Sequence, residues 1–123
     1  MLVAVTAGTP RDLFGEAGAP GAARDRAVAR WLELTRVVLP GMAREHGWPI
    51  HLDHCFMRVC LDAALGAPWT ATVRRPALRH MTDAQLAAAL AVAEEVAVRP
   101  ERLPVLNAAS LDGRRAARGA SAG

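Results

Sequence analysis

The sequence contains no lysine and no tyrosine, so all fifteen of its basic residues are arginines. A GC-rich genome explains this bias more simply than a functional choice does, and the many Ala, Gly and Pro residues fit that explanation. Residues 1–111 carry twelve arginines against eleven acidic residues, and Arg114, Arg115 and Arg118 supply much of the net charge of +3. Nucleic-acid binders usually concentrate positive charge on the folded domain. The near-neutral body therefore argues against nucleic acid as a partner.

Aromatic residues are scarce, at 4% of the chain, and residues with β-branched side chains are few. This shortage argues against a β-sheet protein. Alanine, the strongest helix former, is abundant, and 52% of the residues are hydrophobic. A chain of 123 residues can build one hydrophobic core and not two. We therefore expect a compact, all-α single domain of four to five helices.

Two cysteines are too few for the disulfide framework of a small secreted protein. On one helix, Cys55 and Cys60 would point in different directions and would not form a bridge. Residues 1–5 lack the basic leader of a signal peptide. No apolar run approaches the ~20 residues of a membrane span. These absences predict a cytoplasmic protein with free thiols and no membrane partner.

The composition divides the chain into three parts. Residues 1–23 are rich in Gly, Ala and Pro and are expected to form a flexible lead-in. Residues 24–111 form the predicted helical domain. Residues 112–123 are small, polar and arginine-rich, so we expect a disordered basic tail.

Apolar spacing predicts the main helices of the domain. The first runs to Leu39, where Pro40-Gly41 ends or kinks it. The second runs from Asp53, a good N-cap residue, to Gly66. The third begins at the capping box formed by residues 82–85, and its alanines indicate a close approach to another helix.

The second predicted helix carries most of the chain's reactive side chains. Both cysteines, two of the four histidines, an arginine and two aspartates fall between residues 51 and 62. At about 100° per residue, the polar residues collect on one face and the apolar residues, with Cys60, on the other. The polar face holds His51, His54, Cys55, Arg58 and Asp62.

The start of this helix is the predicted catalytic site. A thiol in the first turn lies near free N–H groups and the positive end of the helix dipole, which lower the pKa of a thiol. Cys55 is therefore the candidate nucleophile, and His54 or His51 is the candidate base that takes its proton.

Three further residues are candidates for binding the substrate. Arg58 could hold an anionic group, Asp62 could orient a histidine or act as a base, and one of Trp48 and Trp69 could line a pocket beside the thiol. The resulting hypothesis is a small soluble enzyme that acts on a small-molecule substrate. No P-loop or GxGxxG turn is present, so no cofactor is expected.

Other interpretations of the same residues stay open. An amphipathic helix always has a polar face, on which Arg58 and Asp62 would form an ordinary i, i+4 ion pair. The alanine-rich helices also suit a non-catalytic interaction module, such as an accessory subunit or a homo-oligomer. A zinc site is a weaker alternative, because the spacing of its candidate ligands fits no regular motif. Those ligands are His46, His51, His54, Cys55 and His80.

Overall fold

The computed structural model describes residues 21–122, with side chains as far as residue 119, and this part of the chain is helical without any strand. The order is α1 (Ala22–Glu33), the π-helical turn η2 (Leu34–Val38), α2 (Leu39–His46), α3 (Asp53–Leu65), the 3-10 turn η3 (Trp69–Ala71), α4 (Ala77–His80), α5 (Asp83–Val98) and α6 (Arg102–Ala122). The predicted all-α class is confirmed. The predicted lead-in, residues 1–23, lies outside the described residues as far as residue 20.

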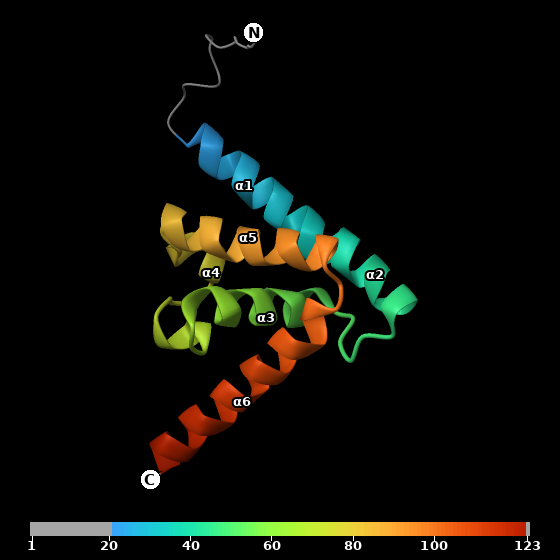
Figure 1. Cartoon of the computed structure of the whole chain (residues 1–123). Coiled ribbons are helices and arrows are strands. Elements are labelled where there is room, and N and C mark those ends of the chain that lie inside the picture. Colours follow the sequence, from blue (N-terminus) through green and yellow to red (C-terminus); the bar gives the residue numbers. More distant parts are fainter. Residues whose placement is uncertain (1–20, 123) are drawn as a thin grey trace, which may run out of the picture.

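The helices stack around α3 and α5. Figure 1 shows α5 between α1 and α3, with α6 packed on the opposite side of α3. One core cluster joins the layers. It includes Trp31 from α1, Leu34 from η2, Phe56 and Val59 from α3, and Leu86 from α5. No helix in residues 21–122 combines the length and apolar character needed to cross a membrane.

Helix α5 begins and packs as its sequence predicts. The Gln85 amide donates to the Thr82 hydroxyl at 3.0 Å, and the Thr82 amide donates to the Gln85 side-chain oxygen at 2.9 Å. This reciprocal pair is a complete capping box. Ala89 and Ala93 are fully buried in the core. Their small size lets the α5 backbone lie close to its neighbours, as expected for an alanine seam.

The break predicted at Pro40-Gly41 takes another form, because α1 continues into α2 without a loop. A proline in a regular α-helix lacks an N–H, and its ring collides with the carbonyl four residues earlier. Just before Pro40, the Leu39 amide donates to the carbonyl of Leu34, five residues back, in a wider π turn. The buried Thr35 hydroxyl donates to the Trp31 carbonyl at 2.9 Å. The wider turn lets the helix continue past Pro40 without this collision.

Two arginines fasten α1 to α5. Arg30 donates from Nε and Nη2 to the two carboxylate oxygens of Glu94, each at 2.8 Å. These hydrogen bonds lower the pKa of Glu94. Arg24 reaches Asp83 at 2.6 Å and donates to the Met81 carbonyl at 2.8 Å. The charged flank of the first helix therefore sets its position along α5.

The C-terminal segment differs from its prediction. Residues 112–122 continue α6, where the sequence predicted a disordered tail from residue 112. The physical reason is a contact that composition does not reveal: Arg114 pairs with the buried Asp62 of α3. An alanine-rich continuation of the helix costs little once this anchor is in place.

We expect Ala93→Leu to lower the free energy of unfolding by about 1–3 kcal/mol, because the added side chain overpacks the core beside α5. The matched control is Ala84→Leu, an exposed position in the first turn of the same helix. Urea denaturation of both variants tests the expectation. Equal stability of the two would contradict a tight alanine seam.

Candidate functional site

Helix α3 begins at Asp53, as predicted, but its capping differs from the prediction. Leu52 is the N-cap residue, and Asp53 is the first residue of the helix. The Cys55 amide donates to the Leu52 carbonyl at 3.0 Å, and the His54 amide donates to the Asp53 carboxylate at 2.7 Å. Cys55 is therefore the third helical residue, one position deeper than a cap at Asp53 would place it.

The predicted catalytic residues lie around this helix start, with no side-chain hydrogen bond between them among the described residues. His51 is exposed in the preceding loop, and Cys55 is half-buried. His54 is also exposed, and its Nδ1 lies 3.6 Å from the Asp53 carboxylate. No hydrogen bond within residues 21–122 joins the Cys55 thiol to either imidazole. The catalytic role of these three residues stays a prediction.

Trp48 belongs to the core rather than to a pocket wall. Its ring is 8% exposed, and it lies edge-on to Phe56 with 5.8 Å between ring centroids. The His46 imidazole stacks on the Trp48 ring with 5.6 Å between ring centroids. The residues from 21 to 122 hold no group of three His, Cys, Asp or Glu side chains suited to a metal ion. The five proposed zinc ligands do not gather.

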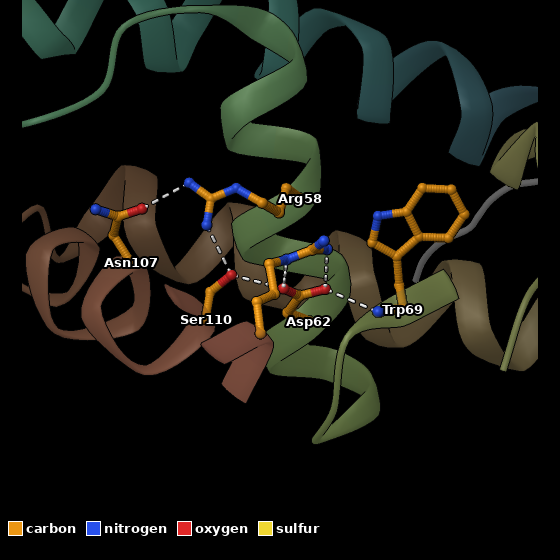
Figure 2. A network of polar contacts seen from close by, with 6 residues as sticks. Arg58, Asp62, Trp69, Asn107 and Ser110 are labelled. Atoms are coloured by element: carbon orange, nitrogen blue, oxygen red, sulfur yellow. Dashed lines mark hydrogen bonds and ion pairs between the residues drawn. The ribbon is translucent and has the colours of Figure 1, made fainter. Parts of the chain in front are cut away.

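Asp62 is the centre of a buried polar network between α3 and α6, shown in Figure 2. Its side chain is only 4% exposed, whereas the sequence predicted a position on the polar face of the helix. Arg114 donates to both carboxylate oxygens, from Nε at 2.9 Å and from Nη2 at 3.0 Å. The Ser110 hydroxyl donates at 2.6 Å, and the Trp69 amide donates at 2.8 Å.

These four bonds decide the role of Asp62. Each oxygen accepts two hydrogen bonds, which uses the acceptor sites of a carboxylate. A carboxylate in this state has no acceptor site left for a substrate. Asp62 therefore fixes α6 and the start of η3 against α3. The i, i+4 ion pair with Arg58 does not form; Arg114 is the partner.

Arg58 joins the same network in a different way. Its Nη1 donates to the Ser110 hydroxyl and its Nη2 donates to the side-chain oxygen Oδ1 of Asn107, both at 2.8 Å. Both partners are neutral. Among the described residues no carboxylate lies within 4.0 Å of this guanidinium, which reaches the Asp62 carboxylate only through the Ser110 hydroxyl, so its position is fixed without a direct ion pair.

A groove of about 410 Å³ opens beside this guanidinium. Side chains from α1, η2, α3 and α6 and from the segment 69–78 line it. Four of them are arginines, and no aspartate or glutamate of the described chain is among them. The arginines are Arg36, Arg58, Arg75 and Arg114; the others are Trp31, His54, Met57, Leu61, Trp69, Pro76, Ala77 and Leu78.

Trp69 supplies an aromatic wall for the groove. Its backbone is held by Asp62, and its ring is half-buried. The guanidinium carbon of Arg75 lies 5.3 Å from the ring centroid, which is a cation–π distance. Arg75 is itself exposed and has no carboxylate within 4.0 Å among residues 21–122. The groove therefore combines an apolar floor, an aromatic face and unmatched positive charge.

Of the six predicted site residues, the groove contains Arg58 and His54. Sequence reasoning missed Asn107, Ser110 and Arg114, which meet Arg58 and Asp62. A usable signal was present, because positions 107, 110 and 114 are spaced to share one face of a helix. Because residues 112–123 were predicted to be a disordered tail, Arg114 was not assigned to the same helix face as Asn107 and Ser110.

Comparison with known proteins assigns no relative. No family model matches the chain, no curated protein matches it, and no solved structure matches it. Any function must therefore be argued from the groove itself.

Asp62→Asn should lower the free energy of unfolding by about 3–5 kcal/mol, because it leaves Arg114 without its buried partner. Asp112→Asn is the matched control, since Asp112 is exposed and pairs with Arg115 on the surface of α6. We expect a change below about 1 kcal/mol for the control. Urea denaturation measures both, and a small loss for Asp62→Asn would show that the network does not hold α6.

The two thiols should differ in reactivity. Cys60 is fully buried, and burial raises the pKa of its thiol to about 12. A chromogenic disulfide reagent should therefore modify Cys55 alone in the native protein and reach Cys60 only after denaturation. The Cys55→Ser variant should release no chromophore while folded. Two equivalents released at similar rates from the native wild type would contradict the burial of Cys60.

Proposed function

We propose that the groove beside Arg58 binds a small organic anion. The observation that carries this proposal is the state of Arg58, whose guanidinium is oriented by Asn107 and Ser110 but faces no carboxylate among the described residues. A protein that needed Arg58 only for packing would gain more from a charged partner. The neutral partners hold the side chain in place for a charge that comes from outside.

Orientation before binding favours affinity. An arginine that is free in solvent loses side-chain entropy when it captures a ligand. Asn107 and Ser110 have already imposed that loss on Arg58 during folding. The N–H groups that they leave unused can form paired hydrogen bonds with a carboxylate or phosphate. Burial of the network behind the guanidinium also reduces the screening of its charge by water.

The other lining residues define the rest of the ligand. Met57, Leu61, Pro76 and Leu78 give the groove an apolar floor. Small-molecule sites are commonly apolar with a few oriented polar groups, and their volumes are about 300–1,000 Å³. The volume of about 410 Å³ falls in that range. An anion with an apolar body suits this groove better than a bare inorganic ion.

This proposal keeps the small-molecule ligand of the sequence hypothesis but rests on binding rather than on a nucleophilic thiol. Cys55 is not among the groove residues, whereas His54 is. A proton transfer to or from the bound ligand would therefore fall to the His54 imidazole. The nucleophilic role of Cys55 stays a prediction.

Arg58→Gln should abolish binding of phenyl phosphate and benzoate, because it removes the oriented charge. Arg44→Gln, on the exposed face of α2, changes the net charge equally and should bind as the wild type does. Amide and arginine Nε–H chemical shifts, followed by NMR during titration at physiological salt, report both affinity and location. Thermal denaturation of each variant checks that the fold is kept.

Two outcomes would contradict the proposal. The first is a wild-type protein whose groove signals do not move with either ligand. The second is an equal loss of binding in Arg58→Gln and Arg44→Gln, which would indicate a general effect of net charge. If Arg58→Gln fails to fold, Arg75→Gln replaces it, because Arg75 is exposed and lines the same groove.

A further inference from the structure

We infer that the ligand of the groove is an aryl phosphate monoester, the phosphate ester of a phenol. This inference rests on the proposed anion site and adds two features of the ligand: its charge and its planar ring. Each feature follows from a separate observation on the groove.

The charge of the ligand follows from the state of the four arginines. Arg114 is matched by Asp62. Arg36 is exposed and lies 3.9 Å from Asp53, a distant surface contact. Arg58 and Arg75 have no carboxylate partner within the described chain. A phosphate monoester carries about −1.5 to −2 charges near pH 7 and would match both guanidiniums, whereas a carboxylate would match only one.

The planar ring follows from Trp69. Its amide donates to the buried Asp62 carboxylate, so the indole is presented from a fixed backbone. The ring faces the groove, and its present neighbour on one face is the guanidinium of Arg75. Aromatic rings stack on indole with more favourable geometry than saturated rings do. An incoming aryl ring can take the place of the Arg75 guanidinium on the indole.

The two features are linked through Arg75. This residue is exposed and follows a segment without regular structure, so its side chain is free to move from the indole to the ligand. On displacement by the aryl ring, its guanidinium can pair with the phosphate from the side opposite Arg58. Trp69 would then hold the ring while two arginines hold the charged end.

Isothermal titration calorimetry with three probes tests the inference: phenyl phosphate, cyclohexyl phosphate and benzoate. Phenyl phosphate should bind more tightly than cyclohexyl phosphate by about threefold to tenfold, because the probes share their charge and differ in aromaticity. Trp69→Leu should remove this difference. Phenyl phosphate should also bind more tightly than benzoate, and Arg75→Gln should reduce that preference.

The outcomes separate this inference from the proposed function. Equal affinities for phenyl and cyclohexyl phosphate, both lost in Arg58→Gln, would overturn the aryl ligand and leave the anion site standing. Benzoate binding as tightly as phenyl phosphate would overturn the phosphate. A single-stranded DNA oligonucleotide that binds far more tightly than phenyl phosphate would overturn a small-molecule ligand. Failure of all probes to bind the wild type would remove the anion site as well.

Discussion

The packing of α6 and η3 on α3 depends on the buried carboxylate of Asp62. A buried charge is costly unless every acceptor position is satisfied by a donor. Arg114, Ser110 and the Trp69 amide provide those donors, from α6 and from the turn after α3. These partners can meet only if α6 has one position along α3. The carboxylate therefore converts two amphipathic helices into a pair with a defined register.

The same network determines the electrostatics of the groove. Arg114 and Arg58 both reach the α3–α6 contact, but Arg114 takes the carboxylate and Arg58 takes the neutral oxygens of Asn107 and Ser110. The Arg114 guanidinium holds α3 and α6 together. The other is positioned by that contact and keeps its charge. Stability and the proposed anion binding thus depend on neighbouring side chains with different partners.

The sequence predicted local features well, because they arise within one segment. The all-α class, the start of α3 at Asp53 and the Thr82 capping box were predicted and are observed. The burial of Asp62 was not predicted, because helical periodicity identifies the polar face of α3 but not the helix that covers it. The partner Arg114 lies 52 positions away, in a segment whose composition indicated disorder. The spacing of positions 107, 110 and 114 indicates one face of a helix but does not identify the helix that this face meets.

Hydrogen-bond direction in the network follows from the chemistry of its members. A guanidinium only donates and an ionised carboxylate only accepts. The Ser110 hydroxyl therefore accepts a hydrogen bond from Arg58 and uses its one O–H to donate a hydrogen bond to Asp62. Hydrogen bonds in such a chain polarise one another, so a change at one end is felt at the other. An anion bound at the N–H groups that Arg58 leaves unused would keep the bonds to Asn107 and Ser110, and the buried Asp62–Arg114 pair would keep α6 in place.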